Sequence, residues 1–114
     1  MITIKLKPIS INKAWQGRRF KTKEYTKWRK DFGLLVKFNQ QKKIEPNCEG
    51  NYDICISVFL KNHKMFDIDN CIKPILDGLV ENRIISDDRK IRSLSIVKTS
   101  VLSHDNNIEK IEVS

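Results

Sequence analysis

The sequence has no apolar run near the roughly eighteen consecutive residues that a membrane-spanning helix needs. Glycine and proline are scarce, at four and three of 114 residues, which excludes collagen-like and low-complexity architectures. The three cysteines, Cys48, Cys55 and Cys71, are odd in number, and their spacing fits neither a disulfide framework nor a zinc site. An alternating segment follows Met1 in place of the apolar core of a signal peptide. We therefore expect a cytoplasmic protein with reduced thiols.

The composition is that of one compact domain. Hydrophobic residues make up 39% and charged residues 32%, and 114 residues leave room for one core, so we expect a single domain over residues 1–114. Basic residues outnumber acidic ones by 22 to 14. The excess lies entirely in residues 1–45, which hold thirteen basic and three acidic side chains, against nine and eleven in residues 46–114. A basic first part favours a polyanionic partner such as nucleic acid or an acidic membrane face.

Hydrophobic periodicity predicts an α/β (α+β) fold in the order β-α-β-α-β-β, with helices packed on a mixed sheet of about four strands. The first helix should begin after Thr22 as N-cap, and the second should be short or kinked by Pro74, with Asp69 or Asn70 as its cap. The two last strands should pair with each other around residues 103–107. The expected strands are Ile2–Leu6, Tyr52–Leu60, Leu94–Val101 and Ile108–Val113, and the expected helices start at Thr22 and at Asp69 or Asn70.

Aromatic side chains have two possible roles here. Tyr25 and Trp28 fall on the apolar stripe of the first helix and are therefore predicted to be core residues. Trp15 and Phe66 flank basic loops, where stacking on a base and ordinary packing are equally compatible with the sequence. Cys71 lies inside an acidic motif but has no base near it in the sequence, so we assign it a packing role.

The acidic motif is Asp67-x-Asp69-Asn70-x-x-Lys73-x-x-x-Asp77, followed by the pair Asp87-Asp88. Carboxylates that converge from separate elements suit Mg²⁺, which prefers oxygen ligands and keeps positions for water and substrate phosphate. A lysine among them can stabilise charge that develops on a phosphate. Each member also has a simpler interpretation, as a helix cap, a solvated i,i+4 pair or turn residues.

At these residues the sequence resembles the RusA family of Holliday-junction resolvases, whose core motif D-x-D-N-x-x-K-x-x-x-D-x-L is followed by D-D. Here the motif reads DIDNCIKPILDGL and then ISDD, and the resemblance extends to Pro8-x-Ser10-x-Asn12 and to Tyr25-x-x-Trp28-Arg29. The resemblance implies that Asp67, Asp69 and Asp88 are catalytic carboxylates that bind a metal and that Lys73 is the catalytic lysine. It places Asn70, Asp77 and Asp87 in supporting positions.

The resemblance further implies a Mg²⁺-dependent endodeoxyribonuclease, with Mn²⁺ as a possible substitute, that acts as a homodimer on four-way DNA junctions in recombination, repair or phage replication. The basic run that precedes the motif in some members is represented here by Lys61, His63 and Lys64, followed by Met65 and Phe66. Basic loop residues next to a phosphodiester site are expected to bind DNA phosphates. The expected DNA-binding residues are Lys13, Arg18, Arg19, Lys21, Lys23, Lys61 and Lys64.

Two other functions are compatible with the same residues. The chain could be a non-catalytic or degenerate junction-binding module, in which the basic part binds DNA and the acidic motif is structural. It could also be a metal-dependent nuclease for flaps, other branched duplexes or RNA, because the chemical groups would be the same. The intact set of Asp67, Asp69, Lys73 and Asp88 favours an enzyme.

Overall fold

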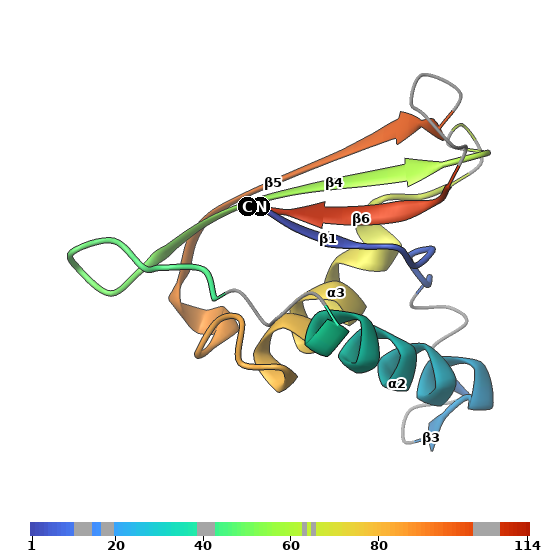
Figure 1. The fold of residues 1–114 in the computed structure, drawn as a ribbon, viewed down its shortest axis with the longest axis horizontal. Helices are drawn as coiled ribbons and strands as arrows, with labels where there is room; N and C mark the ends of the chain where they lie inside the picture. The colour runs from blue at the N-terminus through green and yellow to red at the C-terminus, as the bar shows by residue number, and fades with distance from the viewer. Residues whose placement is uncertain (11–14, 17–19, 39–42, 63, 65, 102–107) are drawn as a thin grey trace.

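The fold is that of a small α+β domain in which a four-stranded mixed sheet packs on two helices, as the sequence predicts (Figure 1). The structure is a computed structural model and describes residues 1–10, 15–16, 20–38, 43–62, 64, 66–101 and 108–114. Figure 1 shows the sheet as one layer and the helices α2 and α3 as a second layer on one of its faces. The two chain ends lie side by side at the same end of the sheet.

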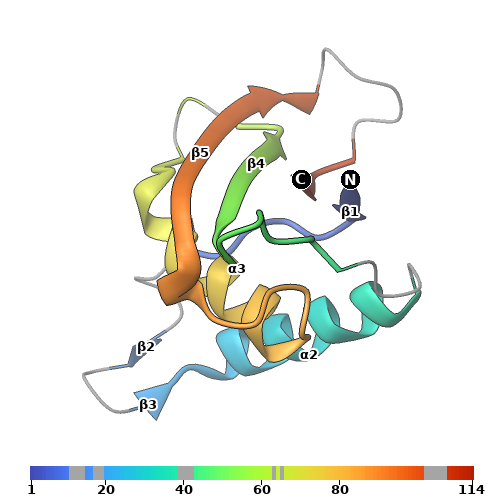
Figure 2. The same ribbon diagram turned by 90° about the vertical axis from the view of Figure 1, so that its left-hand side faces the viewer.

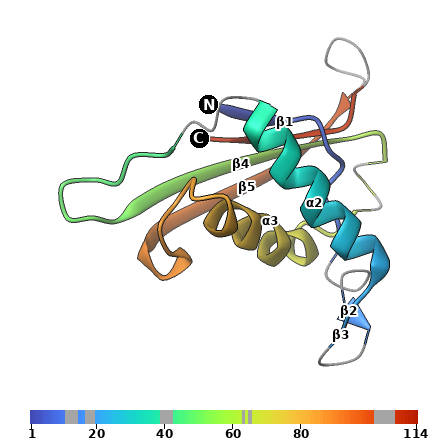
Figure 3. The same ribbon diagram turned by 60° about the horizontal axis from the view of Figure 1, so that its bottom comes forward.

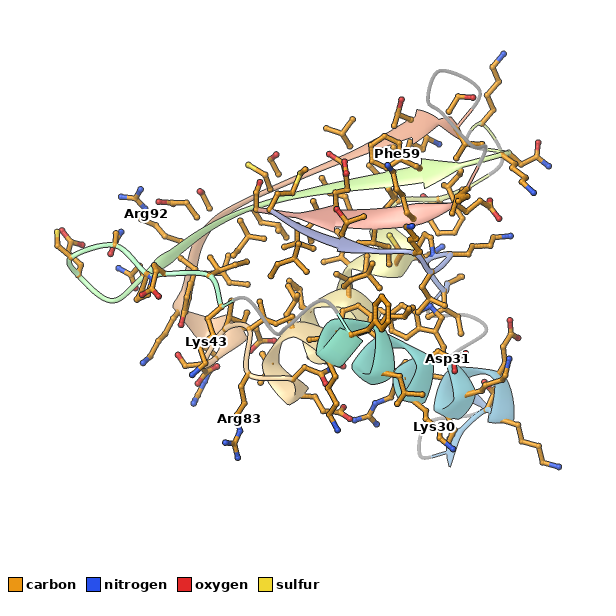
Figure 4. All side chains as sticks on the ribbon, viewed as in Figure 1. Lys30, Asp31, Lys43, Phe59, Arg83 and Arg92 are labelled. Atoms are coloured by element: carbon orange, nitrogen blue, oxygen red, sulfur yellow. The ribbon has the colours of Figure 1, made fainter. Side chains whose placement is uncertain are left out.

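The first helix, α2, spans Lys23–Phe38 and begins where the sequence predicts. The hydroxyl of Thr22 accepts a hydrogen bond from the backbone N–H of Tyr25 at 3.1 Å, which satisfies one of the free donors of the first turn. The apolar stripe is buried against the sheet at Tyr25, Trp28, Phe32 and Val36. On the opposite side Lys30 is exposed and lies away from the sheet (Figure 4). The prediction that Tyr25 and Trp28 are core residues is confirmed.

The strand β4, Tyr52–Leu60, lies inside the sheet, whose order is β1-β6-β4-β5. Its alternate residues Tyr52, Ile54, Ile56, Val58 and Leu60 are all buried on the face that meets the helices. On the other face Lys110 Nζ lies 4.8 Å from the centroid of the Phe59 ring, which Figure 4 places on the side of the sheet away from the helices. The remaining strands are β1 (Ile2–Ile4), β5 (Ile91–Ser100) and β6 (Lys110–Val113).

The predicted pairing of the last two strands is wrong. β5 and β6 do not bond to each other, because β4 lies between them and pairs in parallel with β5 and antiparallel with β6. Parallel strands need a long crossover connection, and here the second helix provides it between β4 and β5. The closeness of β5 and β6 in the sequence suggested a hairpin. Instead β4, most of whose residues are buried, takes an interior place and hydrogen-bonds to a strand along each of its edges.

The second helix, α3, spans Asp69–Glu81 and contains Pro74. The cap prediction is wrong: Ile68 occupies the N-cap position without a side-chain hydrogen bond, and Asp69 is already helical. The helix packs closely on α2, because a Cβ added at Gly78 would lie 2.8–3.0 Å from the ring of buried Phe32 (Figure 3). A glycine at this position therefore lets the two helices approach.

Two further features complete the described fold. Within the predicted N-terminal loop, β2 (Trp15–Gln16) and β3 (Phe20–Lys21) form a small antiparallel ribbon that projects from the body at the start of α2 (Figure 2). Among the helices that the structure describes, none is long and apolar enough to cross a membrane.

Candidate active site

The acidic motif lies where the connection after β4 enters α3. Asp67 is in that connection, Asp69 opens the helix, and both carboxylates are exposed to solvent. Their carboxyl groups lie close enough for Asp69 to change the pKa of Asp67, and the amide of Asn70 donates to Asp67 Oδ2 at 3.4 Å. The structure therefore brings Asp67, Asp69 and Asn70 together at the N-terminal end of α3.

The neighbouring Asp69 changes the pKa of Asp67. Hydrogen bonding of protonated Asp67 to Asp69, together with the negative charge of Asp69, raises the pKa of Asp67, while the cation of Lys98 opposes that rise. Two carboxylates that compete for a proton are also well placed to share a cation, because a positive ion removes the repulsion between them. This pair is thus an oxygen-rich site open to solvent.

Lys73 forms the second part of the site, further along α3. Its ammonium lies 2.9 Å from Asp77 Oδ1 and 3.6 Å from Asp88 Oδ2. The hydrogen bond to Asp77 is the main reason that the pKa of Lys73 is raised, with a smaller contribution from Asp88. Lys73 therefore stays protonated, and its side chain is 58% exposed, so its charge can reach a bound phosphate.

Asp88 reaches Lys73 from a different element, the short 3₁₀ helix η2 (Asp88–Lys90), which leads into β5. Asp87 caps this helix: its carboxylate accepts from the backbone N–H of Arg89 at 2.9 Å and pairs with the Arg89 side chain at 2.8 Å. These hydrogen bonds with Arg89 lower the pKa of Asp87 to about 2. Asp87 thus fixes the turn that presents Asp88.

The donor set fits a divalent cation at Asp67 and Asp69. Among the described residues, no three His, Cys, Asp or Glu side chains already form a metal-binding group. Asp88 instead contacts Lys73, which lies one helical turn after Asp69 on the same face of α3. The carboxylate pair of Asp67 and Asp69 therefore lies next to the ion pair of Lys73 and Asp88 along one face of α3. These four are the residues predicted to be catalytic.

Comparison with protein families decides the assignment. A family model described as Endodeoxyribonuclease RusA matches residues 7–114, nearly the whole chain. The chain belongs to the RusA family. No curated protein matches it. RusA proteins are endodeoxyribonucleases that act on branched DNA junctions, and nucleases of this type generally use a divalent metal. The resemblance inferred from the sequence motif is confirmed.

The predicted DNA-binding residues of this RusA domain fall into two groups. Lys23, Lys61 and Lys64 are exposed, at the start of α2 and in the connection between β4 and α3. Lys64 and Lys61 precede Asp67 in that same connection, so they border the carboxylate pair in the chain. The backbone of Lys21 lies in β3. The predictions for Lys13, Arg18 and Arg19 lie outside the described residues.

Sequence reasoning missed Lys98 as part of the RusA site. Its ammonium donates to the backbone carbonyl of Phe66 at 2.6 Å, immediately before Asp67. Lys98 pairs in register with buried Val58, so it lies on the sheet face that meets the helices. A lysine at such a position in an alternating strand was the available signal, since an ammonium on that face needs a partner. Lys98 therefore anchors the segment that carries Asp67.

The interface between α2 and α3 supports the part of the site that contains Lys73 and Asp77. Arg29 on α2 pairs with Glu81 on α3 and lies 5.7 Å from the centroid of the Tyr25 ring. Burial raises the pKa of Tyr25, and the nearby charge of Asp77 adds to that rise. Cys71 is fully buried in α3, as predicted, and burial raises the pKa of its thiol to about 11. These contacts hold α3 in place next to Lys73 and Asp77.

Proposed function

We propose that residues 1–114 form one endonuclease domain that resolves four-way Holliday junctions by cutting a phosphodiester bond in each of two strands. The observation that carries the proposal is the run of acidic and basic side chains along α3 in a RusA chain: Asn70 donates to Asp67 at its N-terminal end, and Lys73 contacts Asp88. Recombination, repair and phage replication all produce such junctions.

In this proposal Asp67 and Asp69 would hold Mg²⁺, for which Mn²⁺ can substitute, and Asp88, which contacts Lys73, would complete the ligand set. The bound ion would lower the pKa of a water molecule and neutralise charge on the scissile phosphate. The residues of the chain have separate tasks: Asn70 orients Asp67, and Asp77 holds Lys73 in place. Lys73 stabilises the negative charge that builds up on the phosphate oxygens in the transition state.

The basic residues bind the junction arms. Lys23 at the start of α2 and Lys61 and Lys64 in the connection that leads to Asp67 are exposed cations. Lys13, Arg18, Arg19 and Lys21 extend the basic segment along the chain. Cations of this kind bind the phosphate backbone without reading the base sequence. The junction, rather than a linear duplex, is selected by shape.

The functional unit is proposed to be a homodimer. A four-way junction offers two equivalent strands for cutting, whereas each chain carries a single D-x-D-N motif. A two-fold dimer would present two sites at a fixed separation, with both basic segments facing the DNA.

The decisive experiment compares the wild-type protein with Asp69→Asn on a four-way junction, a linear duplex and a single strand, with Mg²⁺ or EDTA. We expect the wild type to cut the junction only with Mg²⁺. Asp69→Asn should not cut, but it should bind the junction at least as tightly, because the substitution removes a charge that repels phosphate. Asp53→Asn is the matched control, since Asp53 is an exposed carboxylate on β4 that pairs with Arg92 at 2.9 Å.

The possible outcomes distinguish a junction resolvase from a binding module and from a nuclease for other nucleic acids. Junction binding without Mg²⁺-dependent cutting by the wild type would indicate a binding module. Preferential cutting of flaps or RNA would indicate the other kind of nuclease. Strong cutting by Asp69→Asn would remove Asp69 from the metal site.

A further inference from the structure

Two attachments to Tyr52 hold the segment that carries Asp88. At the start of this segment, the backbone N–H of Ser86 donates to the Tyr52 hydroxyl at 3.1 Å, and the hydroxyl donates to Ser86 Oγ at 3.2 Å. At its end, Ile91 pairs with Tyr52 in the register of β4 and β5. The residues between, Asp87–Lys90, therefore form a short loop that is closed at both ends on one residue. Figure 1 shows this segment in orange, at the end of the sheet where β4 begins.

Tyr52 is itself fixed by packing in the core. Its side chain is only 5% exposed and lies on the sheet face that meets the helices. The two residues before Ser86, Ile84 and Ile85, are buried as well, and the backbone N–H of Ile84 donates to the carbonyl of Leu79 in α3 at 2.9 Å. Both sides of the contact between Tyr52 and Ser86 are thus anchored, so the hydroxyl fixes where the loop begins.

The pairing of β4 with β5 is irregular directly after Tyr52. Ile91 pairs with Tyr52, but the next residue of β4, Asp53, pairs with Ser93, so Arg92 is an extra residue in β5. Irregularities of this kind redirect a strand, and they are frequent next to active sites. The pair at Tyr52 is therefore a separate attachment, offset from the regular ladder that starts at Asp53.

Asp88 depends on this loop because it reaches the site from outside α3. Lys73 is carried by α3 and Asp88 by η2, and their charged groups lie 3.6 Å apart across the two elements. Asp87 fixes the shape of the turn by accepting from the backbone N–H of Arg89, but both of these residues move with the turn. The Tyr52 hydroxyl instead ties the turn to the sheet.

We propose that Tyr52 is a positioning residue for phosphodiester cleavage, whose hydroxyl sets the place of the Asp88 carboxylate beside Lys73. The inference rests on the proposed function, because that function takes Asp88 as a ligand of the metal. Tyr52 is buried, so it acts through Ser86 and the turn rather than on the DNA. A carboxylate placed before the substrate arrives needs no reorientation during the reaction.

The first test is Tyr52→Phe, which keeps the buried ring and removes the hydroxyl. We expect kcat for junction cleavage to fall by about ten-fold or more, since small displacements at a reacting centre cost up to about 10²-fold. The Mg²⁺ concentration for half-maximal cleavage should rise, while KM for the junction stays within a few-fold. Ser86→Ala should have a smaller effect, because the backbone N–H remains, and adding it to Tyr52→Phe should lower kcat little further.

Ser93→Ala is the matched control for these variants. It also removes one hydroxyl hydrogen bond, which Ser93 Oγ donates to Asp53 Oδ1 at 2.7 Å, but this bond does not involve the loop. Its kcat, KM and Mg²⁺ dependence should equal those of the wild type. An unchanged kcat and Mg²⁺ dependence in Tyr52→Phe, or an equal loss in Ser93→Ala, would overturn the positioning role.

The second test needs neither metal nor cleavage. The backbone N–H groups of Arg89 and Lys90 donate to Asp87 at 2.9 and 3.2 Å, and their hydrogen exchange can be followed by NMR in EDTA. Tyr52→Phe should accelerate their exchange by up to about ten-fold, as for one lost hydrogen bond, and Ser93→Ala should not. Unchanged exchange in Tyr52→Phe contradicts the proposal. If the wild type does not cut junctions with Mg²⁺, the proposed function fails, while accelerated exchange still supports the attachment of the turn to Tyr52.

Discussion

At the scale of single residues, the site depends on ion pairs that fix the positions of its charged side chains. Lys73 is the clearest case, because two carboxylates fix its ammonium while more than half of the side chain stays exposed. Such an arrangement keeps the charge in place before the substrate arrives. A preorganised charge stabilises the transition state without the cost of reorienting during the reaction.

We expect Lys73→Ala to slow junction cleavage by about 10² or more, the effect of losing one preorganised stabilising group. Junction affinity in EDTA and thermal stability should change little, because the side chain lies on an exposed helix face. Single-turnover cleavage rates measure the effect, with Lys90→Ala, an exposed lysine of η2, as the control. A near-normal rate would leave Lys73 as a surface ion pair.

Lys98 is predicted to act as a positioning residue. Lys98→Met removes the hydrogen bond to the Phe66 carbonyl but keeps the length of the side chain, so the Asp67 segment should lose its anchor. Small displacements at a reacting centre cost up to about 10²-fold. We expect kcat to fall by about ten-fold or more while KM for the junction stays within a few-fold.

The control for Lys98→Met is Lys37→Met, because Lys37 is exposed in the last turn of α2. The Mg²⁺ concentration that gives half-maximal cleavage should shift in Lys98→Met and not in the control, because a loosened Asp67 changes ion binding. An unchanged kcat and Mg²⁺ dependence would contradict a positioning role.

At the scale of secondary-structure elements, the position of the α3 face that carries Lys73 and Asp77 depends on how closely α3 packs on α2. Gly78 faces the buried Phe32 ring, and the ion pair between Arg29 and Glu81 joins the same two helices. Because Lys73 and Asp77 lie on α3, a shift of this helix would move them relative to Asp88 on η2. The interface therefore couples the core to the site.

We expect Gly78→Ala to lower the free energy of unfolding by about 1–2 kcal/mol, because overpacking against Phe32 outweighs the gain of about 1 kcal/mol in helix propensity. Gly33→Ala is the matched helical control: its Cβ would meet the movable Asn82 side chain at 3.1 Å. Urea unfolding of both variants measures the difference. A Gly78→Ala protein at least as stable as the wild type would show that the helices can separate without cost.

At the scale of the whole molecule, symmetry determines what one chain can do. The described part of the chain carries the proposed carboxylate pair, Asp67 and Asp69, where the connection after β4 enters α3. Two coordinated cuts in equivalent strands require a second site at a fixed separation. A two-fold assembly of identical chains is the simplest way to provide it.

We predict a stable dimer with twice the 13.4 kDa mass of the chain, measured by sedimentation equilibrium at micromolar concentration. Mixed dimers with one Asp69→Asn subunit should leave mainly singly nicked junctions, whereas wild-type dimers should give fully resolved duplexes. Asp53→Asn mixed dimers are the control and should resolve junctions normally. A protein that stays monomeric even with junction DNA would contradict the dimer.

The sequence by itself determined the local features of this protein. The stripe from Tyr25 to Val36, the Thr22 cap and the alternation from Tyr52 to Leu60 all follow from periodicities that neighbouring residues impose on one another. The D-x-D-N motif also identified the family, because the spacing of its charged groups is fixed along one short segment.

Only the tertiary structure decided which distant segments meet. The placement of β4 between β5 and β6, the contact of Asp88 with Lys73, and the hydrogen bond from Lys98 to Phe66 join residues far apart in the chain. Such pairings depend on how apolar faces from the whole chain are buried together, which no local pattern contains.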